Sequence, residues 1–212
     1  MKYRLLLDFD GTITKQDTCI AMVEQFANGS WEHIEEMWST GDLSTQECAV
    51  ELFKIMDFTE TQLKEHLLSL DKDGYFNGLL EICSLKKIDV AIVSDGYDFN
   101  IKTILDANKC VIKDIYSNVL SFNEEGKVVI EFPYSNNDCR KCGTCKRNIY
   151  NEYKKSCDKI IYVGDGYSDR CVGEIADILF AKDSLAKYCD YREIDYIPYK
   201  TFKDVIEYIE KI

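Results

Sequence analysis

Arg4-Leu5-Leu6-Leu7-Asp8-Phe9-Asp10-Gly11-Thr12 places two carboxylates, two positions apart, directly after a short apolar run. Side chains alternate faces along an extended strand, so Asp8 and Asp10 are expected to point the same way while Phe9 points back into the core. Neighbouring carboxylates repel unless a cation lies between them or one of them keeps its proton. The stretch therefore predicts a magnesium site, a nucleophile beside an acid/base, or both.

Apolar runs of this kind recur and are predicted to be parallel strands covered on both faces, because each is short and rich in Val, Ile or Leu. They are Tyr3–Phe9, Ile88–Ser94, Lys159–Gly164 and Asp177–Ala181. Helical patterns such as Tyr97–Ala107 and Phe202–Ile212 separate them, which indicates an α/β fold with a doubly wound parallel sheet. An inserted hairpin is expected from the alternating stretches Tyr116–Phe122 and Lys127–Phe132.

The interval from residue 17 to 75 carries helix signals and no convincing strand. Ser44-Thr45-Gln46-Glu47 and Thr59-Glu60-Thr61-Gln62 both have the form of a capping box, a hydroxyl followed three residues later by Glu or Gln. We expect a small helical cap domain of about four helices at 17–75, inserted after the first strand. The catalytic core would then comprise residues 1–16 and 76–212.

The overall composition narrows the class of protein. A net charge of −12 over 212 residues argues against a nucleic-acid binder. Ten cysteines follow no recognisable signal peptide, so the thiols are expected to be reduced in a cytoplasmic protein. No apolar stretch approaches the ~20 residues that span a bilayer, so no membrane association is expected. The sequence does not indicate an oligomeric state.

Three of the apolar runs end in an Asp-Gly turn, at Asp10-Gly11, Asp95-Gly96 and Asp165-Gly166. One such turn alone means little. Ligands of an open parallel sheet bind beyond the carboxyl ends of its strands, so the three turns are expected to meet in one crevice. Asp169 either caps a helix or joins Asp8, Asp10 and Asp165 as a fourth carboxylate for a hard cation such as Mg²⁺.

These motifs carry a specific resemblance. Asp8-Phe9-Asp10-Gly11-Thr12, Ser94, a later lysine and Gly164-Asp165-Gly166-Tyr167-Ser168-Asp169 resemble, in that order, the four motifs of the haloacid dehalogenase superfamily. The helical insertion after the first motif resembles the cap of its phosphoserine-phosphatase-like branch. The resemblance covers nearly the whole chain and implies a phosphatase that acts on a small phosphate ester.

The resemblance also implies a role for each motif residue. Asp8 would attack phosphorus and form an aspartyl phosphate, and Asp10 would protonate the leaving oxygen and then deprotonate the attacking water. The phosphoryl oxygens would be held by Ser94, Thr12 and the backbone around Gly11, Asp95 and Gly96. Magnesium would be held by Asp8, Asp10 through its carbonyl, and Asp165, with Asp169 beside the metal or on the lysine.

One lysine should face the transferring phosphoryl group, because its charge must be neutralised. Lys146 is the favoured residue, since it opens a helical run before the third strand, where the third motif of the superfamily belongs. Lys102 is the alternative. Contacts to the rest of the substrate are expected from the cap, with Asp17 as the best candidate; Gln25, Trp31 and Trp38 are the others.

Cys139, Cys142 and Cys145, with two residues between neighbours, lead into this lysine. A closed zinc site needs a fourth ligand, and none is evident. A ferredoxin-like pattern would need a cysteine near position 149, where Ile149 stands. Zinc is therefore disfavoured against reduced thiols or a disulfide formed on oxidation.

The cysteine-rich approach to the lysine, together with Ser94-Asp95-Gly96-Tyr97-Asp98-Phe99, is most similar to the methionine-salvage phosphatases that act on 2-hydroxy-3-keto-5-methylthiopentenyl phosphate. Phosphoserine phosphatases and phosphoethanolamine/phosphocholine phosphatases share much of the same framework. Two other enzyme classes are weighed: phosphoryl transfer to an acceptor other than water, and dehalogenation, which Asp10 and the magnesium site disfavour. A metal-binding interaction module organised by the cysteines is the non-enzymatic alternative.

Overall fold

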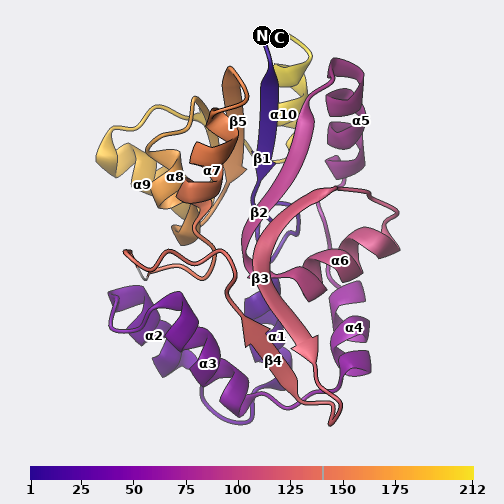
Figure 1. The fold of residues 1–212 in the computed structure, drawn as a ribbon, viewed down its shortest axis with the longest axis vertical. Helices are drawn as coiled ribbons and strands as arrows, with labels where there is room; N and C mark the ends of the chain where they lie inside the picture. Colours follow the sequence, from indigo (N-terminus) through magenta and orange to yellow (C-terminus); the bar gives the residue numbers. More distant parts are fainter. Residues whose placement is uncertain (140) are drawn as a thin grey trace.

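Seven strands form one sheet in residues 1–139 and 141–212, which the computed structural model describes (Figure 1). Its order is β4-β3-β2-β1-β5-β6-β7, and all neighbours pair in parallel except β3 with β4. The strands are β1 (Tyr3–Leu7), β2 (Asp89–Tyr97), β3 (Asp114–Phe122), β4 (Val128–Glu131), β5 (Lys159–Gly164), β6 (Ile178–Ala181) and β7 (Ile197–Pro198). The predicted α/β fold with a parallel sheet is confirmed.

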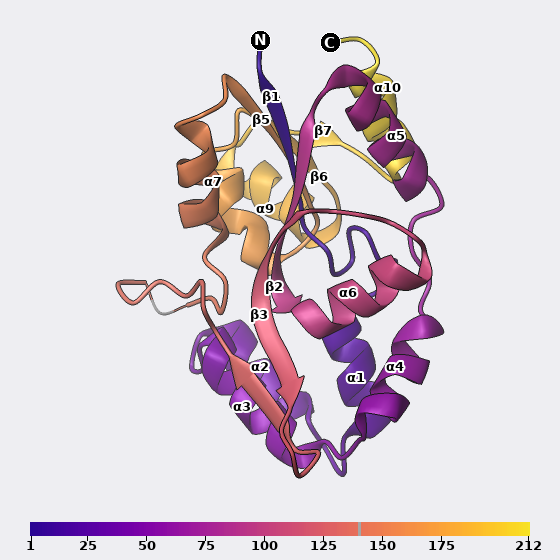
Figure 2. The same ribbon diagram turned by 45° about the vertical axis from the view of Figure 1, so that its right-hand side comes forward.

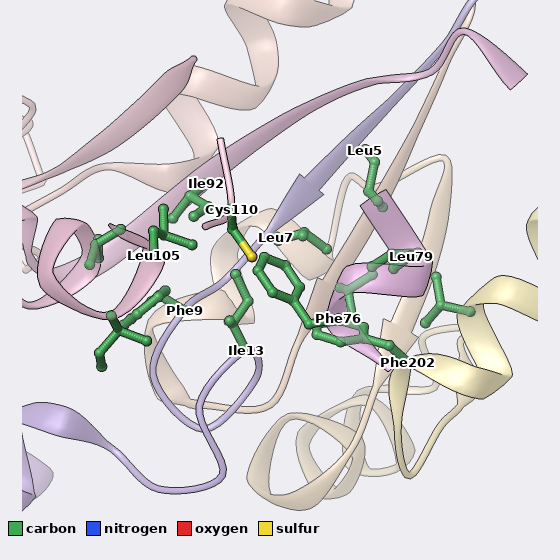
Figure 3. Packing of buried hydrophobic residues seen from close by; sticks show 14 of the residues in the cluster. Leu5, Leu7, Phe9, Ile13, Phe76, Leu79, Ile92, Leu105, Cys110 and Phe202 are labelled. Carbon is green, nitrogen blue, oxygen red and sulfur yellow. The ribbon is translucent and has the colours of Figure 1, made fainter. Parts of the chain in front are cut away.

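Helices cover both faces of this sheet. One face carries α5 (Phe76–Lys86), α6 (Asp98–Ala107) and α10 (Phe202–Ile209), and the other α7 (Lys146–Lys154), α8 (Arg170–Gly173) and α9 (Asp183–Arg192). β1 supplies both sides because its side chains alternate: Leu5 and Leu7 pack in one buried cluster, and Leu6 packs in the other. Figure 3 shows Phe9 and Ile13 within the first cluster, so Phe9 points into the core as predicted.

Four helices occupy the fully described stretch from 17 to 75, as predicted. They are α1 (Thr18–Phe26), α2 (Glu32–Thr40), α3 (Thr45–Ile55) and α4 (Glu60–Leu68). Both capping boxes form: the amide of Glu47 donates to Ser44 Oγ at 3.2 Å while the amide of Ser44 donates to the Glu47 carboxylate at 2.9 Å, and Thr59 repeats the arrangement. In Figure 2 these helices lie below the sheet, next to the ends of β3 and β4.

The interpretation of 115–132 as an inserted hairpin was incomplete. β3 and β4 do pair in the predicted hairpin, from Phe122 opposite Val128 to Val119 opposite Glu131. The first half of β3, however, pairs in parallel with β2, so this strand belongs to the main sheet. The two-residue strand β7 was not predicted, because it is too short to give a periodic signal.

No helix in the described part of the chain combines the length and the apolar character needed to cross a membrane.

Candidate active site

A cavity of about 200 Å³ opens at the carboxyl ends of β1, β2 and β5. The predicted residues Asp8, Asp10, Ser94, Asp95, Gly96 and Asp165 all line it. The helical insertion supplies its other wall, with residues from α1, α2 and α3. The three Asp-Gly turns therefore meet in one crevice, as the parallel sheet predicts.

The buried Lys146 connects Asp8, which lines the cavity, to Asp169. Its ammonium donates to Asp8 Oδ1 at 2.6 Å and to Asp169 Oδ1 at 2.6 Å, and its side chain is only 2% exposed. Burial alone would lower the pKa of Lys146, but the charges of Asp169 and Asp8 outweigh it and raise the pKa above its ordinary value. Lys102, the alternative, pairs instead with Asp98 on the surface, 2.7 Å away.

Asp169 was predicted to lie beside the metal or on the lysine, and the structure shows its contact with Lys146. Its carboxylate lies within 4.8 Å of those of Asp8 and Asp165. Its oxygens are already committed: Oδ1 accepts from Lys146 and from Tyr162 at 2.5 Å, and Oδ2 accepts from the amides of Asp165 and Gly166. Asp169 therefore orients Lys146 and holds the turn after β5.

Asp165 lies beside this ion pair, directly after β5. Thr12 Oγ1 donates to its Oδ1 at 2.7 Å. Gly11 has a φ of +72°, and a Cβ at this position would overlap the carboxylate of Asp165. Burial, and then the charge of Asp169, raise the pKa of Asp165 to about 6. Thr12 is buried and supports Asp165 rather than lining the cavity, so a direct phosphate contact from its side chain is not supported.

This described group has an excess of negative charge. It contains one ammonium, that of Lys146, and three carboxylates, those of Asp8, Asp165 and Asp169. Burial, and then the charge of Asp169, raise the pKa of Asp8. A divalent cation between Asp8 and Asp165 would relieve this repulsion, because both carboxylates would then face a positive charge. The donor set, all oxygen, fits a hard cation.

Asp10 occupies a separate position on the same rim. Its Oδ1 accepts from the amide and hydroxyl of Thr18 at 2.8 and 2.6 Å, and its Oδ2 lies 3.4 Å from Ser94 Oγ. Burial, and then the charge of Asp17, raise the pKa of Asp10 to about 7. Its carboxylate groups with Asp17 and Cys19 rather than with Asp8 and Asp165, so the predicted metal contact could come only from its backbone carbonyl.

The end of β2 completes the rim. Ser94 is fully buried and accepts from the amide of Gly96 at 3.0 Å, while Gly96 leaves room for the carboxylate of Asp10, which any Cβ there would overlap. The carboxylate of Asp95 accepts from the amide of Thr144 at 2.7 Å. Asp95 therefore anchors the loop before α7, and only its backbone remains for the predicted phosphate contact.

The helical wall is aromatic and acidic. Trp31, Trp38 and Glu35 from around α2 line the cavity, and the ring of Trp38 makes a T-shaped contact with that of Tyr167 of the core, with ring centroids 5.2 Å apart. Asp17 lines it too, while also capping α1 through the amides of Cys19 and Ile20. Gln25 is exposed and is not among the described lining residues.

Comparison with known proteins agrees with this geometry. Residues 3–185 match the sequence model of a family described as "Putative Phosphatase". The chain is 30% identical to the 2-hydroxy-3-keto-5-methylthiopentenyl-1-phosphate phosphatase of Exiguobacterium sibiricum, over 99% of this chain and 97% of that protein. The enzyme of the same name from Geobacillus thermodenitrificans is also 30% identical, over 100% and 98%. The chain belongs to this phosphatase family.

Solved structures show that this phosphatase shares its fold with phosphoserine phosphatases. A phospho-aspartyl intermediate analogue of phosphoserine phosphatase aligns with a TM-score of 0.74 at 19% identity, over 98% of this chain and 99% of that one. A phosphoserine phosphohydrolase-like protein from Francisella tularensis aligns with a TM-score of 0.70 at 18% identity, over 99% and 100%. The predicted superfamily and its closeness to the methionine-salvage group are confirmed.

Sequence reasoning missed several residues that support the site of the phosphatase. Tyr162 holds Asp169, Thr18 holds Asp10, and Asn118 binds the backbone of Asp95. Tyr162 lies two residues before Gly164 on the face of β5 that packs against α7, and it looks like an ordinary apolar strand residue. Glu35 belongs to no sequence motif, and it reaches the cavity because of the way in which α2 packs.

The three loop cysteines also belong to the surroundings of Lys146. Cys139 is exposed and Cys142 and Cys145 are half-buried, and all ten cysteines of the phosphatase are free thiols. Cys145 directly precedes Lys146 at the start of α7. A second, smaller cavity lies beside them and is lined in addition by Cys171 of α8, which sequence spacing did not connect with the loop.

Proposed function

We propose that this phosphatase hydrolyses a small phosphate monoester in a Mg²⁺-dependent reaction through an aspartyl phosphate on Asp8. The observation that supports it most directly is the buried contact between Lys146 and Asp8, at the point where β1 ends in the cavity. Phosphoryl transfer depends mainly on positioning and charge neutralisation, and this site provides both. The helices at 17–75 would act as its cap, over a core of residues 1–16 and 76–212.

Asp8 is positioned as the nucleophile. Lys146 fixes its Oδ1, while no described residue donates a hydrogen bond to Oδ2, so Oδ2 would approach the phosphorus. In this step the Oδ2–P bond forms and the bond from phosphorus to the ester oxygen breaks. Lys146 also faces the charge that builds on the phosphoryl oxygens, and the Ser94 hydroxyl would contact one of them.

Asp10 is suited to move the proton. With a pKa raised to about 7 by burial and by Asp17, its carboxyl group is substantially protonated near neutral pH and would donate to the departing oxygen. The resulting carboxylate would then take a proton from the water that attacks the aspartyl phosphate, which restores both side chains. Thr18 holds one oxygen of Asp10, so the other is directed into the cavity.

Magnesium would be held by Asp8, Asp165 and the backbone carbonyl of Asp10, as the superfamily resemblance implies. When bound, it would neutralise charge on the transferring phosphoryl group and on the two carboxylates. Asp169 would contribute indirectly, by keeping Lys146 and the turn at Asp165 in place.

The cavity wall favours a leaving group without negative charge. Asp17 and Glu35 lie on this wall, and none of the described lining residues is Lys or Arg. A substrate with a carboxylate, such as phosphoserine, would meet no Lys or Arg among the described lining residues and would be repelled by Asp17 and Glu35. The apolar lining from Ile20, Trp31 and Leu52 suits an uncharged, partly apolar group. A methionine-salvage-type ester is therefore the favoured substrate.

A second candidate is an ester of an amino alcohol, such as phosphoethanolamine or phosphocholine. Glu35 would face the ammonium group, and Trp31 and Trp38 would offer their rings to it. The two candidates differ in one testable respect, because the negative charge of Glu35 would strengthen the binding of a cationic leaving group only.

The deciding experiment assays the purified protein on four esters, with Mg²⁺ and with chelator: 2-hydroxy-3-keto-5-methylthiopentenyl phosphate, phosphoethanolamine, phosphocholine and phosphoserine. We expect Mg²⁺-dependent release of phosphate, highest kcat/KM for the methylthio ester and lowest for phosphoserine. Glu35→Gln should leave the methylthio ester nearly unchanged and reduce kcat/KM for the amino esters only if they are true substrates. Glu36→Gln, on the exposed face of α2, is the matched control. Undiminished turnover in chelator would contradict the mechanism.

A further inference from the structure

A second group of potential ligands lies on the far side of Lys146 from the catalytic cavity. Cys139, Cys142 and Cys145 from the loop before α7 and Cys171 from α8 line a common cavity of about 90 Å³. The loop and α8 are far apart in sequence, and the sheet order brings them together because α7 and α8 pack on the same face. The fourth cysteine that the loop motif lacks is thus supplied by the fold.

We propose that Cys139, Cys142, Cys145 and Cys171 bind one zinc ion as a tetrahedral four-thiolate site that joins the loop before α7 to α8. Four cysteine ligands from two segments, three of them in a Cys-x₂-Cys-x₂-Cys run, are the ligand type and number that structural zinc prefers. This site is separate from the oxygen-lined magnesium site, and it does not depend on the proposed phosphatase reaction.

The thiols are close enough to affect one another. All four line one cavity, together with Lys146 and Arg147. Four thiolates would repel strongly without a cation, whereas a divalent ion compensates part of their charge. The remaining charge of a four-thiolate zinc centre, −2, would face the side chains of Lys141 and Arg147.

Zinc would draw the four sulfur atoms inward. Tetrahedral Zn–S bonds of about 2.3 Å place sulfur atoms about 3.8 Å apart. Within the described residues, ligand atoms gathered inside 4.8 Å are found only in the groups Asp8–Asp165–Asp169 and Asp10–Asp17–Cys19. Cys139 is exposed, while Cys145 and Cys171 lie at the starts of two helices, α7 and α8.

The position of the site gives it a structural role in the phosphatase. Cys145 directly precedes Lys146, and Cys171 lies two residues after Asp169, so the ion would clamp both partners of the buried ion pair. The same loop accepts a hydrogen bond at the Lys141 carbonyl from the amide of Thr45, at the start of α3. Zinc would therefore also steady the contact between this loop and the helical wall.

The test measures metal directly. Protein produced in zinc-supplemented medium and dialysed against metal-free buffer is analysed by mass spectrometry of the elements. We expect about one zinc per chain, falling at least tenfold in Cys171→Ser and in Cys139→Ser. Cys157→Ser, a half-buried thiol outside the group, is the matched control and should keep its zinc. Circular dichroism identifies any variant that fails to fold, and the exposed Cys139 provides the safer of the two substitutions.

Cobalt supplies a second, independent readout. Replacing zinc by Co²⁺ should produce a thiolate-to-cobalt charge-transfer band together with the visible bands of tetrahedral coordination, and both should be lost in Cys171→Ser. Three results would overturn the proposal: zinc retained unchanged in folded Cys171→Ser, no zinc and no cobalt–thiolate band in the wild-type protein, or a disulfide among these four cysteines in zinc-supplemented protein.

Discussion

The two walls of the catalytic cavity are built in different ways. On the core wall, the carboxylates of Asp8, Asp165 and Asp169 are each fixed by a hydrogen bond or ion pair to a named partner. On the helical wall, Trp31 and Glu35 face the cavity from α2 and its start, and α2 has no side-chain cap at its N-terminus. In the proposed mechanism, the core wall would hold the phosphoryl group, and the helical wall would contact the group attached to it.

This difference predicts how substitutions should divide. Changes in the core wall should lower kcat for every substrate, because the phosphoryl group is common to all of them. Changes in the helical wall should alter the ranking of substrates. The largest effects on kcat are expected from the catalytic carboxylates, and smaller ones from the residues that support them.

Asp8→Asn should abolish turnover, with a loss of kcat of about 10⁴-fold or more, because an amide cannot serve as the nucleophile. Phosphate release on all substrates of the panel measures it, and circular dichroism should show an intact fold. Asp89→Asn, which removes an exposed partner of Arg4 at the other end of the sheet, is the control and should retain activity. Equal loss in both variants would mean that the effect is structural.

Asp10→Asn should reduce kcat by about 10²- to 10⁴-fold for alkyl esters, since the leaving oxygen no longer receives a proton. p-Nitrophenyl phosphate has a leaving group that needs no proton, so its first step should be largely spared. A burst of p-nitrophenol followed by a slow steady state is therefore expected in rapid-mixing experiments. Loss of the burst together with the steady state would contradict the role of Asp10 as acid.

Tyr162→Phe should lower the free energy of unfolding by about 1.5–3 kcal/mol, because it removes a buried hydrogen bond to the charged Asp169. Activity should fall moderately and to the same extent for all substrates. Urea unfolding and the kcat of the panel measure the two effects. Tyr191→Phe, at an exposed position, should change neither quantity.

Asp17→Asn tests the coupling between the two walls. The negative charge of Asp17 favours the protonated form of Asp10, so its removal should lower the pKa of Asp10 from about 7. Activity should fall as the pH rises through this pKa, because Asp10 then loses the proton that it donates. In Asp17→Asn this fall should occur at a pH lower by roughly half a unit, the size expected for a partly solvated pair. Asparagine still caps α1, so the fold should be kept.

The pH dependence of kcat/KM measures this shift. Asp71→Asn, an exposed surface acid paired with Lys15, should leave the profile unchanged. A profile of Asp17→Asn that overlays that of the wild type would show that Asp17 does not influence the acid.

The catalytic strands and turns could be predicted from sequence because their signal is local. Buried strands are continuous apolar runs, and β1, β2, β5 and β6 all followed this rule. The first half of β3 was not recognised as part of the main sheet, since pairing with β2 is decided by tertiary contacts. β7 was missed because two residues carry no periodicity.

Some site residues could likewise be predicted from local sequence. Asp8, Asp10 and Asp165 stand at strand ends, where position alone suggests chemistry. The sequence could not show that the carboxylate of Asp169 accepts hydrogen bonds from Tyr162 and two backbone amides as well as from Lys146. Contacts of that kind, like the meeting of Cys171 with the loop cysteines, depend on how separate helices pack on one face of the sheet.

β3 links the sheet directly to the helices at 17–75. One continuous strand pairs with β2 in the sheet and then with β4 beside the helices, where Phe122 contacts Phe58, with ring centroids 6.2 Å apart. The helices are thus tethered at two places, through their chain connections and through this strand, and wide opening would require the strand to bend. The helices are therefore less free to separate from the sheet than a domain that is joined to it by linkers alone.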